Sequence, residues 1–285
     1  MFDHTRQLAG SSSVKLTRFG GLGSRGLPCW TAVPDRRDAT KPPLVAIHGL
    51  HRGAKVQAAT LAPYAEALGQ TVIAPLFAHE DWPRYQQVVR GGRADLALLS
   101  LLSDLAMAGI SGTKRFELCG YSGGAQFAHR FAMLYPHRVS RLTVIAAGWY
   151  TFPHDAPFPY GLAAPKARSA GWHLRDLHDL RAFLNLPIRV LVGARDDQVD
   201  KNTRSGTKID AQQGRTRRER AARWVAATRD AAHRCGIEPD ITLTELDGCG
   251  HDFRTCLAQT DAQRQHIEIG RGHERKTGTR KENGR

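Results

Sequence analysis

Short apolar runs alternate with longer amphipathic stretches along most of the chain. Most of these runs are apolar on both faces, as buried parallel strands are. The strand candidates are Leu44–Ile47, Gln70–Pro75, Phe116–Cys119, Arg141–Ala147, Ile188–Val192 and Ile241–Leu246. The stretches with helical spacing are Ala54–Leu68, Ala94–Ala108, Ala125–Tyr135, Arg217–Cys235 and Phe253–Ile267. This alternation predicts an α/β fold, a mostly parallel twisted sheet with helices on both faces.

The ends of the chain lack this pattern. Residues 1–13 have polar residues throughout and no continuous apolar run, and we expect a loose N-terminus there. Two shorter strand candidates, Val14–Phe19 and Leu27–Val33, open a domain that we expect to span residues 14–269. Residues 270–285 are basic and carry no hydrophobic pattern, so a disordered tail is expected. Inside the domain, Pro63 is expected to break or kink its helix.

An irregular segment interrupts the alternation at residues 148–186. It interleaves aromatic residues with prolines, which makes it too aromatic for disorder and too rich in proline for regular structure. We expect a small cap-like insertion over the strand ends, with a short helix near Leu174–Leu184. Its first rings, Trp149 and Tyr150, are predicted to form part of a substrate-binding wall. The alternative is that these rings only fill the core beneath the insertion.

The composition is that of a soluble globular protein, with 41% hydrophobic and 24% charged residues. No stretch is apolar for long enough to span a membrane and no signal peptide is recognisable, so a cytoplasmic location is expected. The five cysteines match no zinc pattern. Two of them, Cys249 and Cys256, are close enough in sequence to pair, but reduced thiols are expected in a cytosolic protein.

The formal net charge of +14 is concentrated in two places. One is the tail, and the other is the arginine cluster at Arg215, Arg217, Arg218, Arg220 and Arg223. Such runs can attract nucleic acid, but they are more often a solvated helix face. We expect these arginines to lie opposite the apolar stripe of their helix. Nucleic acid is therefore not the expected partner.

The candidate chemistry follows the strand Phe116–Cys119. Ligands of parallel sheets bind beyond the carboxyl ends of the strands. There the chain reads Gly120-Tyr121-Ser122-Gly123-Gly124 and continues as a helix. This G-x-S-x-G turn between a strand and a helix predicts Ser122 as a nucleophile and the Gly123 N–H as an oxyanion donor. The alternative is a plain glycine-rich turn.

A serine nucleophile needs a base, and His251 has the expected setting. It follows the strand Ile241–Leu246 and opens the last helix. An acid that orients this histidine should follow the strand Ile188–Val192. Three aspartates compete there: Asp196, Asp197 and Asp200.

A second oxyanion donor is expected after the strand Leu44–Ile47. The Leu50 N–H is the candidate, and Gly49 would permit close approach of the oxyanion. His48 is interpreted as structural. Arg52 could hold a substrate carboxylate, although a solvent-exposed loop arginine is the expected case.

Taken together, His48-Gly49, Gly120–Gly124, Gly193-x-x-Asp196 and Gly248-x-Gly250-His251 resemble the α/β-hydrolase superfamily over roughly Val14 to Ile267. The turn Gly193-x-x-Asp196 favours Asp196 as the triad acid, with Asp197 as its main rival. The stretch from Gly148 to Pro153 resembles a bacterial group of these serine hydrolases that has no settled activity.

The resemblance implies hydrolysis of a carboxylic ester in a small-molecule acyl substrate, with no metal and no other cofactor. The alternatives are a peptidase or thioesterase with the same triad, or a basic protein that binds nucleic acid or other anions on a hydrolase scaffold. The pattern does not fix the oligomeric state.

Overall fold

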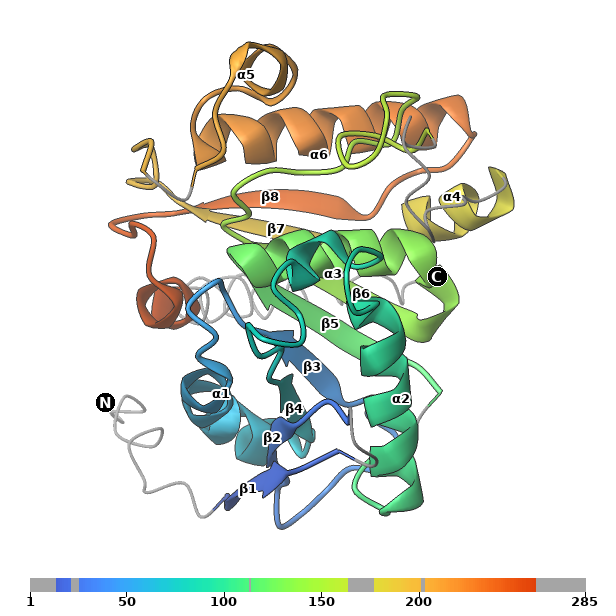
Figure 1. Ribbon diagram of the computed structural model, residues 1–285, viewed down its shortest axis with the longest axis vertical. Helices are drawn as coiled ribbons and strands as arrows, with labels where there is room; N and C mark the ends of the chain where they lie inside the picture. The colour runs from blue at the N-terminus through green and yellow to red at the C-terminus, as the bar shows by residue number, and fades with distance from the viewer. Residues whose placement is uncertain (1–13, 22–25, 113, 164–176, 201–202, 260–285) are drawn as a thin grey trace, which may run out of the picture.

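The fold is built on one eight-stranded sheet with the strand order β1-β2-β4-β3-β5-β6-β7-β8 (Figure 1). The structure is a computed structural model, and it describes residues 14–21, 26–112, 114–163, 177–200 and 203–259. The expected loose N-terminus and basic tail lie outside these ranges. The strands are β1 (Leu16–Phe19), β2 (Cys29–Ala32), β3 (Leu44–Ile47), β4 (Val72–Pro75), β5 (Phe116–Tyr121), β6 (Val139–Ile145), β7 (Ile188–Gly193) and β8 (Ile241–Leu246).

The sheet is parallel from β4 to β8, as the doubly apolar runs predict, and antiparallel at β1 and β2. Its carboxyl edge therefore brings together the loops that follow β3, β5, β7 and β8. Parallel strands that are joined through helices leave those loops as the place where a site can form.

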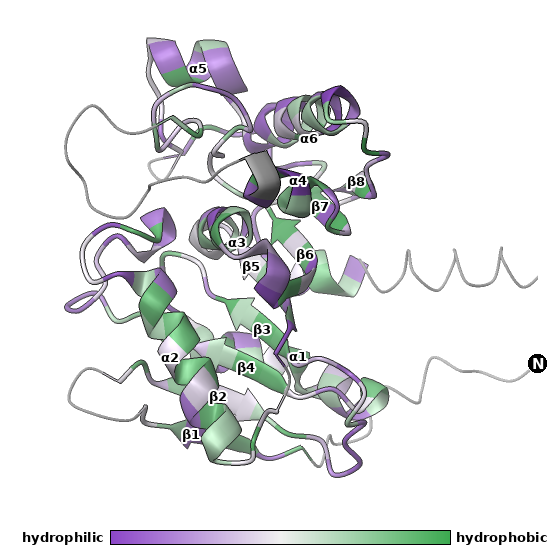
Figure 2. Cartoon of the chain, turned by 90° about the vertical axis from the view of Figure 1, so that its right-hand side faces the viewer, coloured by the Kyte–Doolittle hydropathy of each residue, from purple (hydrophilic) through white to green (hydrophobic). Residues whose placement is uncertain are grey.

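Helices cover both faces of the sheet (Figure 2). On one face lie α1 (Ala54–Leu68) and the helical residues 253–259, which share a small apolar cluster. On the other face lie α2 (Ala94–Met107), α3 (Gly123–Leu134), α4 (Leu177–Leu184) and α6 (Arg217–Arg234), over the main core. Short helical segments are η2 (Tyr85–Gln87), η3 (Pro136–Arg138) and α5 (Thr207–Gln213).

Most predicted elements are confirmed within a few residues. The strand predictions Leu44–Ile47 and Ile241–Leu246 match β3 and β8. The expected break at Pro63 is wrong, because α1 continues through it as one helix. The helix α5 was not predicted, since its sequence Thr207–Gln213 is mostly polar and too short to show a period.

The expectation for the arginine cluster is wrong at two positions. Arg217 and Arg220 are buried on the inner face of α6 and do not lie on its solvent face. Their positions fall on the stripe that also carries Ala221, Trp224 and Thr228, all of them buried. Residue charge thus predicted exposure for Arg217 and Arg220, whereas the helical period of the apolar residues places both on the buried face.

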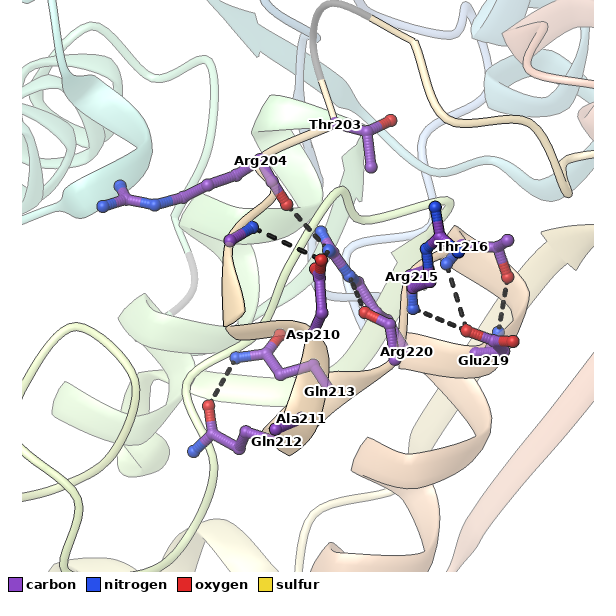
Figure 3. A network of polar contacts seen from close by, with 12 residues as sticks. Thr203, Arg204, Asp210, Ala211, Gln212, Gln213, Arg215, Thr216, Glu219 and Arg220 are labelled. Atoms are coloured by element: carbon purple, nitrogen blue, oxygen red, sulfur yellow. Dashed lines mark hydrogen bonds and ion pairs between the residues drawn. The ribbon is translucent and has the colours of Figure 1, made fainter. Parts of the chain in front are cut away.

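The start of the predicted insertion is held by α5 and α6. The Gln213 side chain accepts a hydrogen bond from the Tyr150 N–H and donates one to the Tyr150 carbonyl. Arg220 donates to the carbonyls of Gly148, Gly214 and Arg204, and forms an ion pair with Asp210 at 3.0 Å (Figure 3). The buried guanidinium thereby satisfies backbone oxygens from three separate segments, which fixes residues 148–150 against the helices.

Candidate active site

Ser122 sits in a strained turn between β5 and α3. Its backbone has φ 54° and ψ −112°, in a region that side chains rarely adopt. The flanking positions, Gly120 and Gly124, have no room for a side chain. A Cβ on Gly120 would collide with the Gly124 carbonyl, and a Cβ on Gly124 would collide with the carbonyls of Ile47 and His48. The G-x-S-x-G pattern is therefore a packing requirement, and it raises the serine at the N-terminus of α3.

Ser122, His251 and Asp196 form one hydrogen-bonded chain. Ser122 Oγ lies 3.1 Å from His251 Nε2, and His251 Nδ1 lies 2.8 Å from Asp196 Oδ2. An ionised carboxylate only accepts, so we assign the Nδ1 proton to this bond. Nε2 is then left to accept the serine proton. The ring of Tyr121 stacks on the imidazole, with 5.0 Å between ring centroids, and so restricts its rotation.

The structure brings one of the three competing aspartates to the histidine. Asp196 is buried and faces His251 directly. Asp197 is exposed, and its carboxylate accepts from the Gln198 side chain. Asp200 lies one step further away, paired with Arg217. The tight approach of Gly193 to the carbonyls of Cys249 and Gly250 holds the Asp196 turn against the His251 loop.

Arg217 completes the surroundings of the carboxylate and was missed by the sequence prediction. Its Nη1 donates to Asp196 Oδ1 at 3.0 Å, and its Nη2 contacts both oxygens of Asp200. The Arg217 and Asp196 side chains are each only 2% exposed. One carboxylate oxygen of Asp196, Oδ2, thus faces His251, and the other, Oδ1, accepts from the buried Arg217 guanidinium.

The predicted oxyanion residues Leu50 and Gly123 lie side by side. A Cβ on Gly123 would lie 2.8 Å from Leu50 Cδ2 and 2.9 Å from the Tyr85 hydroxyl oxygen. Glycine at this position lets the Leu50 side chain and the Tyr85 hydroxyl pack against the start of α3. The Leu50 loop and the first residue of α3 are thus in contact, and the use of their N–H groups as oxyanion donors stays a prediction.

The loop that carries Leu50 is held by buried polar groups. The Phe77 N–H donates to His48 Nε2 at 3.0 Å, and the Tyr85 hydroxyl donates to the His48 carbonyl at 2.6 Å. Burial lowers the pKa of His48 to about 4, so the ring is neutral and can accept. This agrees with the structural interpretation of His48. Arg52 is half-buried and donates to the carbonyls of Phe77 and Trp82, so it braces the same loop.

Trp149 and Tyr150 lie at the cap beside the site, and both are buried. Tyr150 stacks on Trp224, with 4.9 Å between ring centroids, and no described group bonds its hydroxyl. Trp149 is 4% exposed and packs on the Arg130 guanidinium. This burial favours the core-filling alternative for Tyr150. Contact of either ring with a substrate stays a prediction.

The thiols and the possible metal ligands add little to the site. Cys249 and Cys256 are both buried and unbridged. Burial raises the pKa of Cys256 to about 12, so that thiol is protonated. Within the described ranges, no cluster of His, Cys, Asp or Glu could hold a metal ion. In the same part of the chain, no helix is long and apolar enough to cross a membrane.

Comparisons with known proteins agree with this geometry. No family model matches the chain, and no curated protein matches it. Among solved structures, it is similar to poly(aspartic acid) hydrolase-1 from Sphingomonas sp. KT-1, with 26% identity and a TM-score of 0.73 over 88% of this chain and 97% of that one. A poly(3-hydroxybutyrate) depolymerase from Bordetella parapertussis has 24% identity and a TM-score of 0.73 over 85% and 86%.

A third structure, an S-formylglutathione hydrolase from Agrobacterium tumefaciens, has 15% identity and a TM-score of 0.53 over 89% of this chain and 94% of that one. The strand order and these likenesses define the class. The chain is an enzyme of the α/β-hydrolase type.

Proposed function

We propose that this chain is a serine hydrolase that cleaves a carboxylic ester or a related acyl bond. Ser122 is the nucleophile, His251 the general base and Asp196 the acid that orients the base. The observation that carries the proposal is the unbroken hydrogen-bonded chain from Ser122 Oγ through His251 to Asp196. Such a chain removes the serine proton as the hydroxyl attacks a carbonyl.

In the proposed reaction, Ser122 Oγ bonds to the acyl carbon while His251 Nε2 takes the hydroxyl proton. His251 then gives this proton to the leaving group, and an acyl-enzyme remains. Water attacks the acyl carbon, again with His251 as base, which releases the acid and regenerates Ser122. Asp196 stabilises the imidazolium in both halves of the cycle.

The N–H groups of Leu50 and Gly123 are the proposed oxyanion donors. Two observations support them, namely their side-by-side placement and the rigid support of the Leu50 loop by His48 and Tyr85. Donors that are already in place when charge develops cost no reorganisation in the transition state. Removal of one such donor typically costs a factor of roughly 10² to 10³ in turnover.

The substrate is proposed to be a small or medium acyl compound bound beside the cap segment that carries Trp149, while Tyr150 fills the core beneath that segment. A peptidase or thioesterase is the alternative, because both would use the same residues. The likeness to a poly(aspartic acid) hydrolase favours an acid-bearing substrate, which also suits the net charge of +14. A nucleic-acid partner is not proposed, since Arg217 and Arg220 are buried and unavailable to it.

A fluorophosphonate probe tests the nucleophile. Wild-type protein should be labelled on one serine, and tryptic mass spectrometry should place the label in the peptide with Ser122. The Ser122→Ala variant should lose the label while keeping its melting temperature. Covalent label on another serine of wild type, or none at all, would overturn the assignment.

A further inference from the structure

Two arginines share one aromatic ring at the cap. The Arg130 guanidinium carbon lies 4.1 Å from the Trp149 ring centroid, and that of Arg204 lies 5.3 Å from it. Arg204 also lies 5.4 Å from the centroid of Tyr160. These contacts hold the two cations close together, although like charges repel. Cation–π attraction offsets only part of that repulsion.

Among the residues that the structure describes, neither guanidinium has an acidic partner. In the described part of the chain, Arg130 donates to the Thr151 hydroxyl and to the carbonyls of Gln86 and Gln126, and its Nη2 has no partner at all. Burial and the neighbouring Arg204 lower the pKa of Arg130 to about 9. A buried, uncompensated charge is rare, and it leaves a strong positive potential at this place.

Arg204 is the member of the pair that solvent reaches. Its residue is exposed, and its backbone carbonyl is fixed by Arg220 Nη2 at 2.7 Å. In Figure 3 its side chain extends away from the Asp210–Arg220 contacts. No hydrogen bond from this guanidinium to a described residue is present, so its donors are available. A stacked planar guanidinium of this kind suits a carboxylate, which it binds through two parallel bonds.

The aromatic platform of Trp149 and Tyr160, and Arg204 itself, come from segments that follow strands at the carboxyl edge, where the candidate active site lies. Arg130 is on α3, eight residues after Ser122, or about 12 Å along the helix axis. Trp149 follows β6, the neighbour of the strand that ends at the serine. Arg204 lies in the segment that follows β7, so a group that it binds would lie at the same carboxyl edge of the sheet as a carbonyl at Ser122.

We propose that Arg204, stacked on Trp149 and Tyr160 and backed by the buried Arg130, binds a carboxylate at the distal end of the acyl substrate. The inference rests on the proposed serine hydrolase function and narrows its substrate class to acyl chains that end in, or carry, a carboxylate. Trp149 thereby acts as the platform for the arginines, and substrate need not touch its ring.

The test uses pairs of p-nitrophenyl esters of increasing chain length. In each pair the acyl chain ends either in a free carboxylate or in the neutral primary carboxamide of nearly the same shape, so the two members differ chiefly in charge. For wild type we expect kcat/KM for the charged member to exceed that of the neutral one at longer chain lengths. The preference should be roughly tenfold, as a charge-assisted hydrogen bond supplies.

Arg204→Ala should reduce this ratio to near one. The matched control is Arg215→Ala, which removes the same charge from an exposed arginine with no described contact to Trp149 or Tyr160 and should leave the ratio as in wild type. The inference is overturned if wild type shows no preference, if Arg204→Ala keeps it, or if both variants lose it equally. Failure of the serine hydrolase proposal itself would instead appear as absent fluorophosphonate labelling of Ser122.

Discussion

Arg217 and Asp196 form a buried ion pair with 3.0 Å between Nη1 and Oδ1. The carboxylate that we propose as the triad acid therefore shares its charge between an imidazole and a guanidinium. Arg217 is in turn paired with Asp200, whose side chain is 40% exposed. With His251 neutral, these three charged groups leave one net negative charge. When His251 takes a proton, the cluster becomes neutral, which favours the imidazolium that catalysis requires.

The first prediction concerns Asp200. Asp200→Asn should reduce kcat roughly three- to tenfold, because Arg217 then cancels the charge of Asp196 and the imidazolium loses its net counter-charge. In an Arg217→Met background, Asp200→Asn should reduce kcat by a smaller factor, since no guanidinium is then left to cancel the charge of Asp196. Steady-state kinetics of the two single variants and the double variant test this coupling.

The control for this cycle is the melting temperature. Arg217→Met breaks a buried pair, so the variant is expected to be less stable by about 3–5 kcal/mol. Turnover must therefore be measured per folded molecule. Strictly additive losses of kcat would contradict the charge model and leave Asp200 with a structural role.

A second prediction separates the neighbouring aspartates. Asp196→Asn should lower kcat by roughly 10⁴, because an amide cannot hold the catalytic tautomer of His251. Asp197→Asn should change kcat little, since its carboxylate is exposed and bonds only the Gln198 side chain among described groups. If the two variants behave in the opposite way, Asp197 is the acid.

A third prediction concerns acid stability. Burial lowers the pKa of His48 from 6.5 to about 4, and that of the buried His129 also falls well below 6.5. Below pH 6.5 these two histidines bind protons in the unfolded chain while they stay neutral in the folded protein. The contribution of these histidines to the free energy of unfolding is therefore fully present above pH 6.5. It is lost as the pH falls toward 4, and the loss is on the order of 3 kcal/mol for His48.

Chemical denaturation at pH 7 and at pH 4.5 measures this loss. His48→Gln keeps an acceptor for the Phe77 N–H but cannot titrate, so its stability should depend less on pH in that interval. An equal loss in wild type and variant would show that His48 is not among the groups responsible.

The sequence predicted the sheet well, and it singled out three residues that lie within hydrogen-bond reach of one another, because both follow short-range rules. Strand runs, glycines at a tight turn, and polar residues just after strands are visible locally. The arginines of α6 were different. Arg217 and Arg220 are buried only because Asp196, Asp210 and free carbonyls converge on them from distant segments. The charge of an arginine does not reveal such distant partners. The position of Arg217 and Arg220 on the same helical stripe as Trp224 did indicate that they are buried.

Gln213 grips the cap through the peptide groups of Tyr150 and leaves that residue's side chain uninvolved. The hydrogen bonds from Gln213 consequently do not depend on the side chain at position 150. The side chains of residues 149–151 are themselves buried, so exchanging one of them is expected to cost stability even while the Gln213 contacts persist. The start of the cap is thus fixed twice, once through its peptide groups and once through its packing.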